Sequence, residues 1–360
     1  MIKLGVKETA RGLLFRQGRK RCELAWPRGM WRKLPARFRE VMGDHLAHLL
    51  TIDLPLAAGA KGVELNRARP CFWGEFNTLM LGSIPQAAGT RPRSTTRVLK
   101  AFRGIHYRFT TDVPKVPPRR TWKTKPRAVV LFSEDKGSVA SLGLARDMGL
   151  DPVAVYVDDT VSPGERRIRR SRLEMLKRMG IPAEVVTNEV ERLIEPGGRK
   201  RGGVRLGPMH RVTASVFLAL PVAHALGARY IILGNPQDVN LPFVNQEGFY
   251  TYPCFDRTSS WTMQMDGMMR MLTGGGVRVL SLVEPLTLAA VTKLILSHYP
   301  QFLDLILSPD CLDVCLAGKL SEQGPPESSA EPFKLYPPAT IPVELRTELM
   351  LILKDAMTAE

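Results

Sequence analysis

The sequence predicts an α/β protein whose main part is a doubly wound, parallel sheet of five strands, preceded by a basic N-terminal α+β module. Three observations support this fold class. Residues 128–159 have the pattern strand, turn, helix, strand; strands and helices go on alternating to residue 298; and the charge changes sharply near residue 127. Alternation of this kind is typical of a parallel sheet with helices packed on its faces.

The segment 128–159 contains the clearest element pattern. Its first five residues, AVVLF, form an uninterrupted apolar run, as in a strand that is buried on both faces. A polar turn at 133–138 follows, then a helix with apolar residues every third position that stops at Gly149, and a second strand at 153–157. Parallel sheets bind ligands at the carboxyl ends of their strands, so the turn at 133–138 is the first candidate site.

The remaining elements of the predicted sheet follow in the same rhythm. Three further strands are predicted, at 183–187, 229–233 and 277–282. The helices predicted between and after them cover 164–179, 210–226, 258–273 and 285–298. Polar residues gather after the strand at 229–233, in the sequence GNPQD, which is a second place where binding groups are expected.

Charge divides the chain. Residues 1–127 contain 27 Lys and Arg residues against eight Asp and Glu, whereas residues 128–360 contain 24 against 27. We therefore predict an accessory or substrate module at 1–120, a nucleotide-binding α/β domain at 121–320, and a linker with an amphipathic C-terminal helix at 321–360. The basic module is a candidate surface for RNA, tRNA included, or another polyanion, and the alternative is a solvated basic surface.

Within the basic module, strands are predicted at 12–15 and 22–26 and a helix at 36–50. Phe72, Trp73 and Phe76 are predicted either to stack on a substrate or to belong to the core. The segment 91–100, RPRSTTRVLK, combines cations with hydroxyl groups, which predicts either a loop that contacts phosphate or a solvated linker.

Composition excludes several classes of protein. No apolar run reaches the roughly 18 uncharged residues of a membrane helix, and the first twenty residues lack the apolar centre of a secretory signal. Five cysteines, widely spaced, do not form a disulfide framework. We therefore expect a cytoplasmic protein without a membrane partner.

The turn at 133–138, SEDKGS, resembles the phosphate loop of the PP-loop ATP pyrophosphatase superfamily, whose pattern is Ser-Gly-Gly-x-Asp-Ser. Ser133, Lys136 and Ser138 match that pattern. Glu134 and Asp135 stand in the place of its two glycines, and Gly137 stands in the place of its aspartate.

The chain from about residue 129 to 315 is similar in layout to the 7-cyano-7-deazaguanine synthase branch of that superfamily. The segments that carry this resemblance are YIILGN, YPCFDRTSSWTMQMD, VRVLSLVEPL and HYPQF. The resemblance implies a HUP-type nucleotide-binding fold, with ATP bound at 133–138 and adenine near residues 156–158. It also implies a reaction in which ATP adenylates an acceptor and releases pyrophosphate, with Mg²⁺ on the phosphates.

The resemblance assigns roles to individual residues. The expected catalytic residues are Lys136 and Ser138, and the expected magnesium ligands are Asp135 and Asp158. The expected nucleotide-binding residues are Ser133, Lys136, Gly137, Ser138, Tyr156, Val157, Asp158 and Gly234. Polar residues of GNPQD and of the segment YPCFDRTSSWTMQMD are expected to contact the acceptor substrate: Asn235, Gln237, Asp238, Asp256, Gln264 and Asp266.

Two alternatives to this enzyme remain open, and one feature of the branch is not expected. The chain is alternatively a catalytically decayed protein of the same fold that binds nucleotide or RNA, or an epimerase-like enzyme that acts on an acidic amino-acid conjugate. Relatives in this branch often have a four-cysteine zinc site, but here only Cys311 and Cys315 lie in the corresponding region, so we expect no structural zinc.

Overall fold

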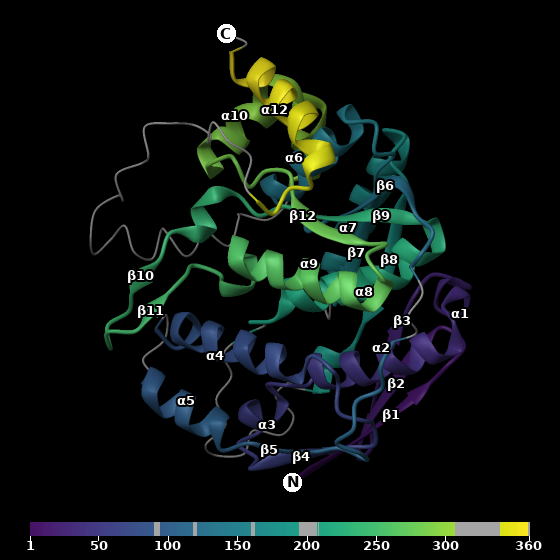
Figure 1. The fold of residues 1–360 in the computed structure, drawn as a ribbon, viewed down its shortest axis with the longest axis vertical. Coiled ribbons are helices and arrows are strands. Elements are labelled where there is room, and N and C mark those ends of the chain that lie inside the picture. The colour runs from purple at the N-terminus through teal and green to yellow at the C-terminus, as the bar shows by residue number, and fades with distance from the viewer. Residues whose placement is uncertain are drawn as a thin grey trace.

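The fold is built around one large sheet. The computed structural model describes residues 1–89, 94–117, 121–159, 163–193, 207, 209–306 and 339–358. Ten strands in these residues form a sheet in the order β12-β9-β6-β7-β8-β3-β2-β1-β4-β5 (Figure 1). A separate two-stranded hairpin consists of β10 (Phe243–Val244) and β11 (Tyr250–Thr251). The predicted α/β class is therefore confirmed, with a large and mostly parallel central sheet.

The predicted parallel strands form one half of this sheet. They are β6 (Lys125–Leu131), β7 (Val153–Asp158), β8 (Ala183–Asn188), β9 (Ala228–Leu233) and β12 (Arg278–Ser281). Each pairs in parallel with its neighbour in the order β12-β9-β6-β7-β8. The apolar run in β6 is explained by two cores, because successive residues along the strand point to opposite faces of the sheet and both faces are covered.

The other half of the sheet comes from the N-terminal part of the chain. Its strands are β1 (Ile2–Glu8), β2 (Gly12–Gln17), β3 (Lys20–Ala25), β4 (Gly62–Leu65) and β5 (His106–Arg108). β3 joins the two halves, since Leu24 and Ala25 pair antiparallel with Asn188 and Thr187 of β8. The predicted sheet of five strands is therefore wrong in its extent. The outer edge of β8 would leave backbone groups unpaired, and β3 satisfies them.

One face of the sheet is covered along its whole width. Its longer helices are α2 (Ala36–Leu49), α4 (Trp73–Gly89), α8 (Arg211–Leu226) and α9 (Ser259–Thr273), which lie in front of the sheet in Figure 1. Three shorter helices accompany them: α1 (Met30–Lys33), α3 (Leu54–Ala57) and α5 (Thr95–Arg103). A single apolar core lies under these helices and contains side chains from both halves of the sheet.

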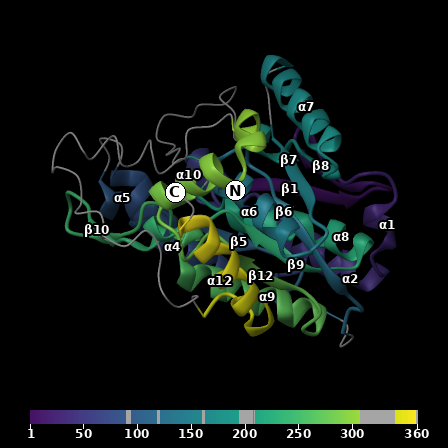
Figure 2. The ribbon, with the colours of Figure 1, turned by 90° about the horizontal axis from the view of Figure 1, so that it is seen from above.

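On the opposite face, the helices that the structure describes cover only the parallel half. Its helices are α6 (Lys136–Asp147), α7 (Pro163–Arg178), α10 (Leu288–His298) and α12 (Val343–Thr358). Among the described residues, the apolar core beneath them contains only residues from Ala128 onward. Figure 2 shows α7 on the side of the sheet away from α2 and α9.

Short 3₁₀ helices complete the described elements. They are η1 (Val190–Leu193), η3 (Gln237–Asn240), η4 (Phe255–Arg257) and η5 (Pro300–Leu305). None of the helices in the described parts of the chain is long and apolar enough to cross a membrane.

The N-terminal half decides one interpretation that the sequence left open and corrects another. Phe72 and Phe76 are core residues, with 2% and 0% of their surface exposed, whereas Trp73 is 36% exposed. The segment 91–100 is not a loop where it is described, because Ser94 caps α5 by accepting a hydrogen bond from the backbone N–H of Arg97. Residues 91–93, Cys311, Cys315 and the linker at 321–338 lie outside the described residues.

Candidate ligand-binding cleft

The turn between β6 and α6 forms one wall of the candidate site, as the sequence predicts. Asp135 is the N-cap of α6, and its carboxylate accepts hydrogen bonds from the backbone N–H of Ser138 and the hydroxyl of Ser133, both at 2.8 Å. The Ser138 hydroxyl donates to the Asp135 carbonyl at 3.0 Å. A helix N-terminus attracts anions, and here the anion beside it is the carboxylate of Asp135.

Glu134 has an uncommon backbone conformation in this turn. Its φ angle is 62°, in the left-handed region that favours glycine, and glycine is the residue that the PP-loop pattern has at this position. The side chain is 3% exposed, and its Oε2 lies 3.7 Å from Nε of Arg169. Burial raises the pKa of Glu134, while Arg169 and Arg172 lower it. A strained, buried, charged residue is a mark of functional sites.

Gly137 and Gly234 bring the start of α6 against the end of β9. A Cβ atom on Gly137 would lie 2.0 Å from the Gly234 carbonyl oxygen, so the two backbones touch where neither has a side chain. The next residue, Asn235, accepts and donates backbone hydrogen bonds with the Ser281 hydroxyl at 2.9 and 3.0 Å. Its side-chain Nδ2 is buried and has no hydrogen-bond partner among the described residues. These contacts place Asn235 beside the turn, as predicted for a residue at the strand's carboxyl end.

Three arginines from three different elements converge on a cavity of about 200 Å³ beside the turn. Arg169 comes from α7, Arg211 from the first turn of α8 and Arg257 from η4. Arg211 forms an ion pair with Asp159, and Nη1 of Arg169 lies 3.6 Å from the same carboxylate. Nη2 of Arg257 lies 3.7 Å from the carboxylate of Asp135. The cavity therefore presents three guanidinium groups against two carboxylates.

The floor of this cavity is the carboxyl end of β6 and β7. Its lining includes Leu131, Phe132 and Ser133 from the first strand and its turn, and Val155, Tyr156 and Val157 from the second. The Tyr156 ring lies beneath Arg169, whose guanidinium carbon is 5.3 Å from the ring centroid, and its hydroxyl accepts a hydrogen bond from Arg169. An apolar floor with a cationic rim suits a ligand that has a flat apolar part and an anionic part.

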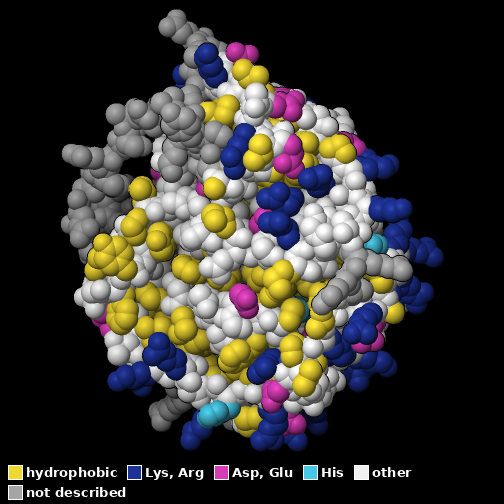
Figure 3. Space-filling view, in the orientation of Figure 1, with side chains coloured by type: hydrophobic (Ala, Val, Ile, Leu, Met, Phe, Trp, Pro, Cys, Tyr) yellow, Lys and Arg dark blue, Asp and Glu magenta, His cyan; other side chains and the backbone are white. Residues whose placement is uncertain are grey.

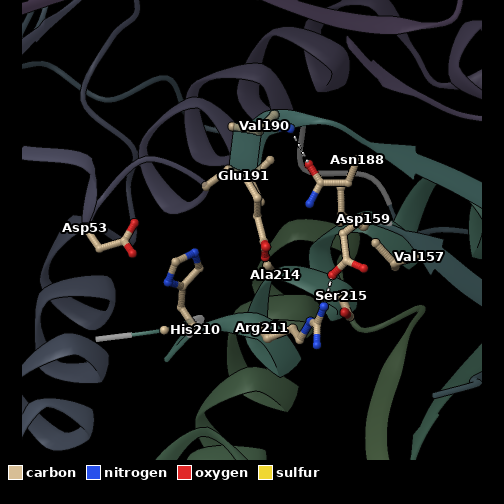
Figure 4. A pocket seen from close by; sticks show the side chains of 13 residues that line it. Asp53, Val157, Asp159, Asn188, Val190, Glu191, His210, Arg211, Ala214 and Ser215 are labelled. Carbon is tan, nitrogen blue, oxygen red and sulfur yellow. Dashed lines mark hydrogen bonds and ion pairs between the residues drawn. The ribbon is translucent and has the colours of Figure 1, made fainter. Parts of the chain in front are cut away.

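A second, smaller cavity of about 60 Å³ adjoins the first and shares Val157, Asp159, Arg211 and Ser215 with it. Figure 4 shows Asp53, Glu191 and His210 pointing into this cavity opposite Asp159. Burial and the neighbouring Asp159 raise the pKa of Glu191, whereas Arg211 and His210 lower it. His210 is 7% exposed, and its Nδ1 is buried without a hydrogen-bond partner in the described structure. The second cavity is therefore acidic and contains an imidazole nitrogen that can form a hydrogen bond with a ligand.

The predicted nucleotide-binding residues lie around the first cavity, with differences in detail. Ser133, Tyr156 and Val157 line it; Gly137, Ser138 and Gly234 support the turn. Lys136 is partly buried at the first position of α6. Asp158 is paired with Arg166 at 3.1 Å rather than directed at Asp135. The described residues contain no group of three or more His, Cys, Asp or Glu side chains that is arranged to hold a metal ion.

None of the six residues expected to contact an acceptor substrate lines either cavity, and four of them, Gln237, Asp238, Asp256 and Asp266, have other partners in the described structure. Asp238 accepts a hydrogen bond from the backbone N–H of Leu288, and Asp256 accepts one from that of Val212. Asp266 binds Arg278 at 2.9 Å, and Gln264 is exposed. Gln237 bonds through its backbone to Leu286. Asp238, Asp256 and Asp266 are therefore bonded within the scaffold, and Asp256 holds the first turn of α8, the turn to which Arg211 belongs.

Besides the predicted residues Ser133, Asp135, Tyr156 and Val157, the two cavities are lined by polar or charged residues that the sequence did not single out. They include Asp53, Asp159, Arg169, Glu191, His210, Arg211, Ser215 and Arg257. The sequence contained a signal for two of these residues. Asp159 lies just after the strand predicted at 153–157, and Arg257 follows Asp256 in the segment that carries the family resemblance.

Comparison with known families and proteins adds nothing to this geometry. No protein-family model matches the chain, and no curated protein is significantly similar to it.

Proposed function

We propose that the cleft at the carboxyl ends of β6 and β7 binds ATP, and that the protein adenylates an acceptor with release of pyrophosphate. The convergence of Arg169, Arg211 and Arg257 beside the turn at 133–138 is the observation that carries this proposal. One guanidinium group can bind phosphate through two parallel hydrogen bonds, and it keeps its positive charge when it is partly buried.

The arrangement of the sheet supports nucleotide binding of the kind found in HUP-type folds. The order β12-β9-β6-β7-β8 puts the first strand of the parallel half in its centre, and the cavity lies between the ends of that strand and the next. Ligands of open α/β sheets bind at the carboxyl ends of the strands, near the point where the strand order reverses direction. Here that point lies between β6 and β9, where Gly137 touches Gly234, and the cavity is on the β7 side of it. The adenine ring would lie on the apolar floor near Val155 and Val157, and the phosphates would face the arginines.

The second cavity is suited to an acceptor. In the proposed reaction an acceptor oxygen bonds to the α-phosphorus, the bond from that phosphorus to the bridging oxygen breaks, and pyrophosphate leaves. The arginines would stabilise the negative charge that develops on the phosphates. Arg211 and Asp159 line both cavities, so a group in the small cavity would lie next to the nucleotide. His210 and Glu191 would orient it and hold its proton.

Magnesium enters this proposal only through the nucleotide. The carboxylate of Asp135 already accepts two hydrogen bonds, and Asp158 is paired with Arg166. Magnesium commonly keeps most of its ligands as water and phosphate oxygens with one or two carboxylates. The described residues do not provide a complete set of magnesium ligands, and no step of the proposed reaction depends on the ion.

Binding and turnover can be measured on the same samples. We expect ATP to bind in a calorimetric titration, and Arg257→Gln to weaken that binding at least about tenfold, because a charge-assisted contact contributes roughly 1.5–3 kcal/mol. Arg229→Gln is the matched control, since Arg229 is exposed and pairs with Glu344 on α12, away from the cleft. Equal affinity in wild type and Arg257→Gln, or no binding at millimolar ATP, would contradict the proposal.

One observation favours a second function, nucleotide binding without turnover. The donors of the turn that would bind phosphate in an active PP-loop enzyme are bonded to Asp135. Assaying the titrated samples for AMP and pyrophosphate separates the two functions, because a binding protein releases neither with any acceptor.

A further inference from the structure

No described helix covers the face of strands β1 to β5 that lies opposite α2, which we call the open face. The core on that side contains, within the described part of the chain, only residues from Ala128 onward, so it ends at the parallel half. A Cβ atom on Gly5, in the middle of this face, would meet no atom closer than 4.0 Å. Within the described residues, the N-terminal half of the sheet is therefore buried on one face and open on the other, as mixed and antiparallel sheets can be.

The side chains on this open face are predominantly cationic. Strand register puts Gly5, Arg16 and Arg21 in one row across β1, β2 and β3. The next row contains Lys3, Glu64 and Arg108. Lys7 lies two residues beyond Gly5 on the same face, opposite Leu14, which in turn lies opposite Glu23. Five exposed cations thus accompany two partly buried carboxylates.

Arg16 and Arg21 lie directly opposite each other in an antiparallel pair. Like charges in such a pair destabilise a sheet, because their Cβ atoms are only about 5 Å apart. The row has no carboxylate of its own, since its third member is Gly5. Because the Arg16–Arg21 pair destabilises the free protein, a bound partner with negative charge would relieve this repulsion and stabilise the sheet.

The dimensions of the face match an extended polyanion. Lys3 and Lys7 lie about 13 Å apart along β1, and five strands span about 19 Å across, as strand geometry dictates. One strand of a nucleic acid places a phosphate every 3.4 Å or so along a duplex, so several phosphates can lie over this surface at once. Leu14 is the one partly exposed large apolar side chain in these rows, which disfavours a protein partner that docks by apolar contact.

We propose that the open face of β1 to β5 binds the phosphodiester backbone of a nucleic acid. Two further exposed cations lie nearby: Arg19 in the turn between β2 and β3, and Lys20 at the start of β3. Lys and Arg side chains also gather along the edge of the molecule over α1 and the neighbouring strands, at the right of Figure 3. The face belongs to the part of the chain that contains the charge excess, and it does not depend on nucleotide binding in the cleft.

The proposal is tested by fluorescence anisotropy with labelled 20-nucleotide RNA and DNA, each single- and double-stranded, at several salt concentrations. We expect at least one of these probes to bind, with an affinity that falls steeply with salt. Replacing both Arg16 and Arg21 by Ser should weaken binding at least tenfold and lower the salt slope by about two, roughly one for each phosphate that the protein no longer neutralises.

The control is the double variant Arg97→Ser and Arg270→Ser, which removes the same charge from exposed positions on α5 and α9, outside the open face. It should leave binding within twofold of wild type. Arg21→Glu is a second test variant that is expected to fold, because it creates an opposite-charge pair with Arg16. Calorimetry with ATP should give wild-type affinity in all of these variants.

Three results would overturn the proposal. One is an equal weakening of binding in the test and control variants, which would indicate net charge rather than this face. Another is wild-type nucleic-acid affinity in both Arg21→Glu and the Arg16/Arg21 double variant. The third is equally tight binding of poly-glutamate, which would mean that the surface accepts any polyanion.

Discussion

Asp135 determines how the candidate site meets an anion. The carboxylate accepts hydrogen bonds from the backbone of Ser138 and the hydroxyl of Ser133, and Arg257 lies 3.7 Å away. These are groups that would otherwise be turned to a phosphate. A phosphate that approaches the start of α6 must displace this carboxylate or bind beside it against like charge. Asp135 therefore competes with the ligand that we propose.

Replacing Asp135 by Asn should tighten ATP binding by about three- to tenfold, because the amide removes the negative charge. Stability should change little, since Asn caps helices as well as Asp does. Calorimetric titration measures the first effect and thermal unfolding the second. Asp147→Asn, at the other end of α6, is the matched control and should not alter affinity. Weaker binding in Asp135→Asn would instead mean that the carboxylate assists the nucleotide, as a magnesium ligand would.

At the scale of elements, periodic apolar patterns predicted the parallel half of the sheet and its helices well. β6, α6 and β7 lie where residues 128–159 indicated them, because their apolar residues face cores of the same domain. α4 was not predicted, because Pro85 and several glycines interrupt its helical pattern. The helix forms all the same because its apolar side chains are buried in the core. The pairing of β3 with β8 joins residues more than 160 positions apart, which local patterns do not encode.

The site was predictable in its position and not in its side chains. A turn after a buried strand indicated where a ligand would bind, and that prediction rests on the geometry of parallel sheets. Arg169 stands in a run of arginines on α7 that is typical of a solvated face, and only the tertiary structure shows that it lies over Tyr156. Arg211 is the first residue of an otherwise apolar helix, where a cation gains nothing from the helix dipole.

Replacing either of two glycines by alanine is expected to change the stability of the protein, in opposite directions. Gly137→Ala should destabilise the protein by about 1–3 kcal/mol and weaken ATP binding, because the new Cβ would overlap the backbone of Gly234 and push α6 away from β9. Gly267→Ala, inside α9, should stabilise it by about 0.5–1 kcal/mol, because nothing lies within 4 Å and Ala favours a helix. Urea unfolding of both variants measures these effects. A stable Gly137→Ala variant would contradict the close approach of the two backbones.

The whole molecule is organised by a sheet that runs through both charge regions. β3 pairs with β8, and one apolar core contains residues from Leu4 to Val279. The Trp26 indole donates a hydrogen bond to the Leu218 carbonyl of α8 at 2.7 Å, and the ring is fully buried. The predicted domain boundary at residue 120 therefore lies close to the change in charge, whereas the sheet and the apolar core continue across it.

Unfolding in urea should consequently be a single transition. Tryptophan fluorescence reports largely on the N-terminal part, since Trp26, Trp31 and Trp73 lie there, whereas circular dichroism at 222 nm reports on all helices. Because the two halves share a sheet and a core, both signals should have the same midpoint and slope. Two separated transitions would instead establish the division into 1–120 and 121–320 as independent folding units.

The hydrogen bond from Trp26 to Leu218 also bears on how the protein is made. The two residues are 192 positions apart, and the β3–β8 pairing is nearly as long in range. During synthesis on the ribosome, α1 and α2 emerge soon after the first three strands and can cover part of their inner face. The α8 carbonyl that pairs with Trp26 follows only about ten seconds or longer after it, at 5–20 residues per second. Until then the Trp26 indole, which is fully buried in the finished protein, lacks its hydrogen-bond partner. We therefore expect the N-terminal half to be incompletely packed, and open to chaperones that bind exposed apolar segments, until α8 has been made.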